Sequence, residues 1–448
     1  MAPGADRRAP RGGRAHGRRP VASPARAAVL DALSAVFEDG APLEDALAAA
    51  LPAGTPSQDR RFARMLAASC LRRLGEIDAA LGPLLEKPLP RKAARVRDIL
   101  RLGAADLLFL DTPAHAAVDQ AVRLARADRT SAGFAGLVNA VLRRLDRERP
   151  APADPLLNLP GWIRERWTAS WGEKATRAMA AALASVPPLD ITVRDPAGTK
   201  GLADALGAEV LATGSLRLAT GTRIDTLPGF AQGHWWVQGA AAALPARLLA
   251  GAVAPGTRVA DLCAAPGGKT LQLAAAGLEV TAVDISDDRL ERLRENLSRT
   301  GLAADVIAAD VRAWTPDVRF DGILLDAPCL ATGTAGRHPD VLWSKRARQL
   351  DSLVSLQAEL TEAAIGMLTP GGVLVFATCS LEPEEGEARA ARLAEDPRLI
   401  SVPIRGEEVG GVQALLTPEG WLRTRPDHDL EGAGGLEGFF AARFRRTG

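Results

Sequence analysis

The sequence predicts an α/β protein in which an open, mainly parallel sheet follows an all-α domain and a small α/β module. Three observations lead to this fold class. Short β-rich runs alternate with helical stretches after residue 243, helical periodicity fills residues 24–149, and a proline-rich segment at 150–160 separates the two. The predicted parts are a disordered basic arm (1–23), a helical domain (24–149), a linker with a small α/β module (150–242) and the sheet domain (243–448).

Composition indicates an ordinary globular protein of two or three domains. The chain has 448 residues, 47% of them hydrophobic and 24% charged, and no apolar run reaches the roughly 18 residues of a membrane span. The formal charge of +1 conceals seven arginines within the first 26 residues. Such an arm either binds polyanions weakly or serves as a solubilising tail. Four cysteines and no secretory signal favour the reducing cytoplasm.

The helical domain carries apolar residues at helical spacing and arginine clusters, which we expect on its solvent faces. Arginines at 60–61, 72–73 and 143–144 form a solvated surface or follow RNA phosphates. Cys70 shares an amphipathic helix with Phe62 and Leu66, so we expect it in the core. His115 follows a proline and is assigned no catalytic role. The apolar positions are Val29, Leu30, Leu33, Val36, Val96, Ile99, Leu100, Ala104, Leu107 and Leu108.

The middle of the chain is predicted to hold an amphipathic helix and then a short strand at residues 189–194. Trp162, Trp167 and Trp171 fall on that helix. Tryptophans can stack on bases, but at helical spacing they are more often part of a core.

Two cysteines follow two buried strands of the predicted sheet. Cys329 comes after the run 320–325, and Cys379 comes after the run 373–377. Ligands bind outside the carboxyl ends of parallel strands, so this pairing indicates thiolate chemistry on a nucleobase. No two cysteines have the close spacing of a zinc site, and neither a metal site nor a disulfide is predicted.

A cofactor site is predicted from three successive strand ends. The strand 257–262 leads into the glycine-rich turn 263–268 at the start of a helix, which favours an anionic ligand group. The next two strands, 279–284 and 305–310, end in Asp284 and Asp310, and an acid at the first of these ends suits a ribose hydroxyl. A P-loop would need glycine where Cys263 stands, and Pro266 removes a phosphate-binding N–H. An adenosyl ligand therefore fits better than a triphosphate.

These motifs resemble those of RNA cytosine-5 methyltransferases. They read D-L-C-A-A-P-G-G-K-T at 261–270, D-A-P-C at 326–329 and T-C-S at 378–380. The helical domain resembles the NusB-like RNA-binding domain in K-P-L at 87–89, H-A-A-V-D-Q-A-V at 115–122 and L-V-N-A-V-L-R-R at 137–144. The whole chain thus resembles the RsmB/Sun group of small-subunit ribosomal RNA (cytosine-5)-methyltransferases, which implies a Rossmann-like catalytic domain.

The resemblance also implies the cofactor S-adenosyl-L-methionine and a set of residues that bind it. Cys379 is implied as the nucleophile and Cys329 as the second cysteine, which releases the product. Asp326 is expected to donate a proton toward the ring nitrogen of the base. The implied cofactor-binding residues are Cys263, Ala264, Ala265, Pro266, Gly267, Gly268, Lys269, Asp284, Asp310 and Asp326.

A thiolate suits this reaction because carbon 5 of cytosine is a poor nucleophile until a covalent bond at carbon 6 makes an enamine. The target base must also be unstacked or single-stranded to enter such a pocket. The expected partner is 16S ribosomal RNA of the small subunit, bound by a monomer without membrane or metal.

Three positions depart from the family pattern, and two other functions stay open. Leu330 stands where serine is usual, Gly336 leaves only Arg337 as a basic residue before His338, and Gly239 replaces an aspartate after Gln238. The alternatives are a tRNA cytosine-5 methyltransferase and a non-catalytic RNA-binding assembly factor.

Overall fold

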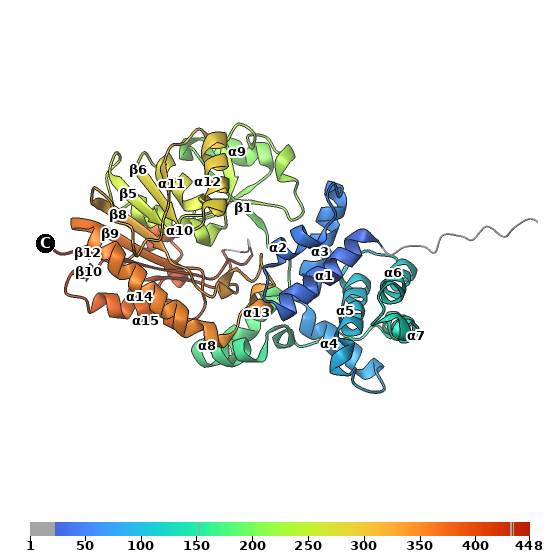
Figure 1. The fold of residues 1–448 in the computed structure, drawn as a ribbon. Coiled ribbons are helices and arrows are strands. Elements are labelled where there is room, and N and C mark those ends of the chain that lie inside the picture. Colours follow the sequence, from blue (N-terminus) through green and yellow to red (C-terminus); the bar gives the residue numbers. More distant parts are fainter. Residues whose placement is uncertain (1–22, 152, 431, 433) are drawn as a thin grey trace, which may run out of the picture.

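The computed structural model describes residues 23–151, 153–430, 432 and 434–448. Apart from Ser23, the predicted basic arm lies outside these residues. Figure 1 shows the helical domain beside a larger α/β domain. None of the helices in the described part of the chain has both the length and the apolar character needed to cross a membrane.

The helical domain is a bundle held together by one hydrophobic core that takes residues from all seven helices. Its helices are α1 (Pro24–Glu38), α2 (Leu43–Ala50), α3 (Ser57–Arg72), α4 (Leu74–Leu81), α5 (Ala94–Phe109), α6 (Ala114–Ala127) and α7 (Ala135–Glu148). Cys70 is fully buried in this core, as expected.

One arginine cluster of this domain is not on a solvent face, which corrects the sequence-based expectation. Arg72 is half-buried and donates to the carbonyl of Gly336 (3.0 Å), far along the chain. Arg73 pairs with Glu76 (2.8 Å) and lies over the ring of Phe109. The long side chains at the end of α3 thus bury their aliphatic stems, that of Arg72 at the contact with the α/β domain and that of Arg73 within the helical domain.

The proline-rich segment is docked on the bundle and contains a short 3-10 turn (Pro155–Asn158). The side-chain oxygen of Asn158 accepts the N–H of Glu76 (3.0 Å), and its amide donates to the Glu76 carboxylate (2.8 Å). A Cβ on Gly75 would lie 1.7 Å from the carbonyl oxygen of Leu157, so the two backbones touch. The segment is therefore a fixed connection.

The small module consists of α8 (Gly161–Leu183), α9 (Thr199–Leu206) and a four-stranded antiparallel sheet of order β2-β3-β1-β4. Gly172, with φ of +79°, interrupts α8. Trp167 is fully buried beside Leu381 and its indole N–H donates to Glu382 (3.0 Å), which favours the core interpretation of this residue. The strands are β1 (Leu189–Val193), β2 (Glu209–Val210), β3 (Leu216–Leu218) and β4 (Trp235–Val237).

The large sheet has the order β10-β12-β9-β8-β5-β6-β7, and β11 also pairs with β12. The strands β5 to β9 are parallel, whereas β12 runs antiparallel to β9 and both remaining strands pair antiparallel with β12. The strands are β5 (Arg258–Leu262), β6 (Glu279–Asp284), β7 (Asp305–Ala308), β8 (Phe320–Asp326), β9 (Leu368–Thr378), β10 (Leu399–Ser401), β11 (Leu422–Thr424) and β12 (Phe439–Arg446).

Helices cover both faces of this sheet, because alternate residues of the buried strands point to opposite sides. In β9, Val373 and Val375 pack with α10, while Leu374 and Phe376 pack with α14. Figure 1 shows α10, α11 and α12 on one side of the sheet and α14 and α15 on the other. The helices are α10 (Ala240–Ala250), α11 (Gly268–Ala275), α12 (Asp287–Thr300), α13 (Val341–Ser344), α14 (Leu350–Met367) and α15 (Glu387–Ala394).

The helical domain rests on the segment that joins β8 to α14. The indole N–H of Trp343 donates to the carbonyl of Leu71 (2.9 Å), and the Asp340 carboxylate accepts the N–H of Leu43 (3.2 Å). With the Arg72 contact to Gly336, these bonds tie α2 and α3 to the region that follows Cys329.

Candidate active site

The glycine-rich turn between β5 and α11 adopts two left-handed backbone conformations. Cys263 has φ of +64° and Gly267 has φ of +102°. A Cβ on Gly267 would lie 2.2 Å from the Leu293 side chain, so this position requires glycine both sterically and conformationally. The turn thereby brings its backbone close to the sheet edge where α11 begins.

Asp284 ends β6 and holds this turn in place. Its carboxylate is buried and accepts the N–H groups of Ala265 and Ser286, each at 3.0 Å. Arg289 of α12 lies 3.7 Å from the carboxylate and donates to the carbonyl of Ala265. Asp284 therefore supports the turn in addition to facing the adjoining cavity.

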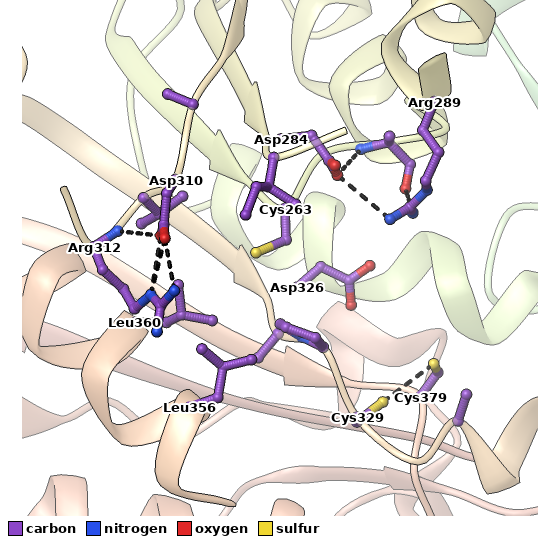
Figure 2. A pocket seen from close by; sticks show the side chains of 17 residues that line it. Cys263, Asp284, Arg289, Asp310, Arg312, Asp326, Cys329, Leu356, Leu360 and Cys379 are labelled. Carbon is purple, nitrogen blue, oxygen red and sulfur yellow. Dashed lines mark hydrogen bonds and ion pairs between the residues drawn. The ribbon is translucent and has the colours of Figure 1, made fainter. Parts of the chain in front are cut away.

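The first cavity lies at the carboxyl ends of β5, β6, β8 and β9 and has a volume of about 290 Å³. Five residues expected to bind a cofactor line it, namely Cys263, Ala265, Asp284, Asp310 and Asp326. Figure 2 shows Asp284 and Asp310 on the side of the cavity away from Cys329 and Cys379. Leu356 and Leu360 of α14 form an apolar wall.

Asp310 lies two residues beyond the end of β7, where the strand was expected to continue. Its carboxylate pairs with Arg312 (2.6 Å), and these hydrogen bonds lower the pKa of Asp310. This acid is therefore ionised and already partnered at the cavity edge.

Most residues of the turn face a different cavity. Ala264, Pro266, Gly268 and Lys269 line a second cavity of about 490 Å³, Ala265 lines both cavities, and Gly267 lines neither. Asp326 borders both cavities and so lies between them. The sequence motif is thus divided between two faces of one turn.

Lys269 and Asp326 form an ion pair with a distance of 2.7 Å between Nζ and Oδ2. Burial alone lowers the pKa of Lys269, but the charge of Asp326 and the bond to it raise that pKa overall. The ammonium also lies 4.9 Å from the centre of the Phe439 ring. Asp326 therefore accepts a hydrogen bond from Lys269, whose position is fixed by these contacts.

The two cysteines lie together at the ends of neighbouring parallel strands. The Sγ atoms of Cys329 and Cys379 are 3.5 Å apart, and Figure 2 marks this contact. The hydrogen bond to Cys379, burial, and the charges of Cys379 and Glu385 raise the pKa of Cys329 well above that of a free thiol. The raised pKa favours the protonated form of Cys329, and either sulfur can be the donor in the contact between the two.

Glu385 was not identified from the sequence, although it fixes the backbone after Cys329. The N–H of Leu330 lies 3.1 Å from both carboxylate oxygens, and Gln357 donates to the same carboxylate (3.0 Å). Burial raises the pKa of Glu385. The run of three acids at 382, 384 and 385 resembles a solvated surface, so the sequence contained no signal for this role. Leu330, which departs from the family pattern, is fully buried.

Asp261 is a second buried acid without an assigned role in the sequence analysis. It accepts the hydroxyl of Thr270 (2.6 Å), while its other oxygen has no hydrogen-bond partner among the described residues. Burial raises the pKa of Asp261 to about 7. The sequence could have indicated a role for Asp261, because this acid lies near the end of a buried strand and directly before the glycine-rich turn.

The segment after Cys329 is anchored to Cys379 and to Gly438, the residue just before β12, by main-chain bonds. The N–H of Gly333 donates to the carbonyl of Cys379 (3.0 Å), and the N–H of Gly438 donates to the carbonyl of Gly333 (2.9 Å). A Cβ on Gly333 would lie 2.0 Å from the oxygen of Gly438. We call residues 331–340 the substrate loop. It carries Arg337 to the wall of the second cavity.

No group of three or more histidine, cysteine, aspartate or glutamate side chains in the described ranges is arranged to hold a metal ion. The side chains gathered at this site are thiols, carboxylates and an ammonium group, next to a cavity of about 290 Å³.

Comparisons with known proteins agree with the two-part architecture. Residues 249–445 match the model of the 16S rRNA methyltransferase RsmB/F family, and residues 23–147 match the NusB family. Ribosomal RNA small subunit methyltransferase B of Xanthomonas campestris is 39% identical over 81% of this chain and 86% of its own length. The protein of that name from Pseudomonas putida is 36% identical over 93% of this chain and 97% of its own length.

Solved structures show the same fold. The crystal structure of PH0851 has a TM-score of 0.71 at 24% identity, covering 95% of this chain and all of that chain. A methyltransferase homolog protein from Pyrococcus horikoshii has a TM-score of 0.53 at 28% identity, covering 65% of this chain and 97% of that one.

Proposed function

Because the chain belongs to the 16S rRNA methyltransferase RsmB/F family, we propose that it methylates carbon 5 of a cytosine in small-subunit ribosomal RNA through a covalent bond to Cys379. The observation that carries this proposal is the 3.5 Å contact between Cys329 and Cys379 at the edge of a cavity with nucleoside-binding acids. The NusB-like domain supports ribosomal RNA over tRNA, and the intact thiol pair argues against a purely structural factor.

The methyl donor is S-adenosyl-L-methionine, which supplies an electrophilic methyl group when bound. The acids at the ends of β6 and β7 suit the hydroxyls of its ribose, and Leu356 and Leu360 offer an apolar surface for a purine. Cys329 and Cys379 line the same cavity as these acids, so a base placed against Cys379 lies beside the donor, and Asp326 borders both this cavity and the second one.

The covalent step begins with Cys379 because its neighbour keeps its proton. In this proposal the S–H of Cys329 donates to the Cys379 sulfur, one of the two directions that their 3.5 Å contact allows, and stabilises a thiolate there. That thiolate attacks carbon 6 of the cytosine, and a new S–C bond forms while the ring's π electrons move toward the ring nitrogen. The ring nitrogen takes up a proton from Asp326 in its protonated form, and Lys269, which donates to this carboxyl group, holds it in place.

Product release requires loss of the carbon 5 proton after methyl transfer. Once Cys379 is bonded to carbon, the negative charge that raised the pKa of Cys329 is gone, so Cys329 gives up its proton more readily. Its thiolate then takes the carbon 5 proton directly or through water. The electrons of that C–H bond re-form the double bond, and the Cys379 thiolate leaves.

Replacement of each cysteine tests this order of events. Cys379→Ala should abolish methyl transfer and give no RNA adduct. Cys329→Ala should allow attack and transfer but slow elimination, so that a protein–RNA adduct persists on a denaturing gel with labelled 16S RNA. Cys70→Ala removes a thiol from the core of the helical domain, away from this cavity, and should leave adduct chemistry unchanged, which makes it the control.

The opposite pattern would assign the nucleophile to Cys329. Mapping of 5-methylcytosine in ribosomal RNA from a deletion strain tests the base and the atom separately. If methyl groups enter the RNA elsewhere than at carbon 5, the proposed chemistry is wrong even though the enzyme is active.

A further inference from the structure

Gly239 is a glycine whose backbone conformation does not require one. Its φ of −59° and ψ of 141° are open to any L-residue. A Cβ at this position, however, would lie 1.8 Å from Oε2 of Glu437 and 2.6 Å from its carboxyl carbon. The side chain of Glu437, from the segment before β12, thus occupies the space that a residue at 239 would fill.

Glu437 uses this space to reach Arg337 on the substrate loop. Its Oε1 lies 2.5 Å from Nε of Arg337, and the two side chains are only 14% and 20% exposed. Asp190 is the second carboxylate near this arginine, at 3.7 Å. Glu437 is therefore the closer and more direct ionic partner of Arg337.

Asp190 is engaged elsewhere, which limits what it offers Arg337. Its carboxylate accepts two bonds from Arg217 (2.7 and 3.0 Å) and the first N–H of α10, at Ala240 (3.0 Å). These bonds leave its distance to Arg337 beyond hydrogen-bond range. Removal of Glu437 would consequently leave Arg337 without a close carboxylate partner.

The backbone on both sides of Glu437 is held by the same network. Arg217 donates to the carbonyls of Gly434 and Gly435 (3.0 and 3.2 Å), and Gly438 donates to Gly333 of the substrate loop (2.9 Å). Contacts with the small module and with the substrate loop thus fix the Glu437 carboxylate next to Gly239.

We propose that Glu437 is a positioning residue that supplies the carboxylate absent at Gly239 and orients Arg337 toward the RNA substrate. Gly239, Arg337 and Glu437 all line the second cavity, together with Lys269 and Asp326. A guanidinium is a rigid, planar fork of five N–H donors, so an ion pair with a carboxylate beside Nε restricts where the whole group can lie, although the Nε–H itself makes no hydrogen bond among the described residues. This inference rests on ribosomal RNA being the substrate.

The ion pair between Glu437 and Arg337 accounts for two departures from the family pattern at once. The chain lacks an acid at 239 and has a single arginine before His338. Because Arg337 stands alone where the family has two basic residues, RNA binding depends more strongly on how Arg337 is oriented. Glu437 provides that orientation from a segment about two hundred residues away from Gly239.

The test compares four variants of the full-length protein in steady-state methylation of 16S RNA. Glu437→Gln keeps the shape but removes the charge, and we expect the KM for RNA to rise about tenfold. Gly239→Ala should raise it similarly, because the added methyl displaces Glu437 from Arg337. Glu437→Ala should also raise it. The double variant Gly239→Asp, Glu437→Ala should have a KM for RNA within about threefold of the wild type. The new carboxylate at 239 can occupy the space that the Glu437 side chain has left and pair with Arg337.

Cofactor affinity and melting temperature, measured on the same variants, separate positioning from folding. A merely structural role would lower the melting temperature and weaken S-adenosyl-L-methionine binding in parallel with the change in KM. The proposal is overturned if Glu437→Gln and Gly239→Ala leave the KM for RNA unchanged, or if the double variant is no better than Glu437→Ala. An inactive wild-type protein would instead contradict the proposed function itself.

Discussion

Replacement of Gly333 by alanine tests whether the contact between the substrate loop and β12 sets the geometry at Cys379. The added Cβ would lie 2.0 Å from the carbonyl oxygen of Gly438, whereas carbon and oxygen normally approach to about 3.3 Å. The two backbones must therefore separate by about 1.3 Å. Because Gly333 also donates to the carbonyl of Cys379, this shift reaches the nucleophile directly.

The expected loss is about a hundredfold in the rate of methyl transfer, since a misplacement of about 1 Å has an effect of that size. The affinity for S-adenosyl-L-methionine should stay within about twofold, because Gly333 does not line the first cavity. Single-turnover transfer to 16S RNA measures the first quantity, and calorimetry measures the second.

Gly336→Ala is the matched control on the same loop. The nearest atoms to a Cβ there are side-chain carbons at 3.7 and 3.8 Å, which is ordinary contact. Its transfer rate should therefore remain near that of the wild type. If Gly333→Ala is as fast as Gly336→Ala, the proposed coupling between this contact and the thiol is incorrect.

Three further changes have expected outcomes. Burial raises the pKa of Asp261 to about 7, so the folded protein holds this proton more tightly than the unfolded chain and loses stability as pH rises from about 4 to 7, by at most about 4 kcal/mol. Asp261→Asn should flatten that dependence in thermal melts of the cofactor-free protein; an unchanged slope would contradict the assignment. Asp284→Ala should weaken cofactor binding and also lower the melting temperature by removing the acceptor of two N–H groups, as calorimetry and melts can show. Deletion of residues 1–149 should leave a protein that binds cofactor, has a lower melting temperature and methylates RNA poorly. The reason is that Trp343 packs against the helical domain and would become exposed to solvent. Full activity at the wild-type melting temperature would refute this.

The sequence predicted those parts of the molecule whose signals are local. The strands before Asp284, Asp326 and Cys379 are short apolar runs with clear ends, and parallel strands present those ends on one edge. The neighbouring positions of Cys329 and Cys379 followed from the same rule. Their Sγ atoms accordingly lie 3.5 Å apart.

Contacts between distant segments were not predictable in this way. Arg72 appeared as a surface arginine because its partner, the carbonyl of Gly336, lies 264 residues away. The glycine-rich turn was treated as one binding surface, yet its residues are divided between two cavities once the backbone turns at Cys263 and Gly267. Glu385 has no sequence pattern of its own, since its role comes from accepting the backbone N–H of Leu330 and the side-chain amide of Gln357, both far along the chain.

The place of β12 in the sheet has a consequence for protein synthesis. This strand is encoded after the other strands of the domain, yet it lies between β9 and β10 and contributes Phe439 beside Lys269. While β12 remains inside a translating ribosome, β9 has an open edge, and the substrate loop lacks its bond to Gly438. The nascent chain can therefore form its helical domain early, but it acquires a complete methylation site only after β12 has emerged.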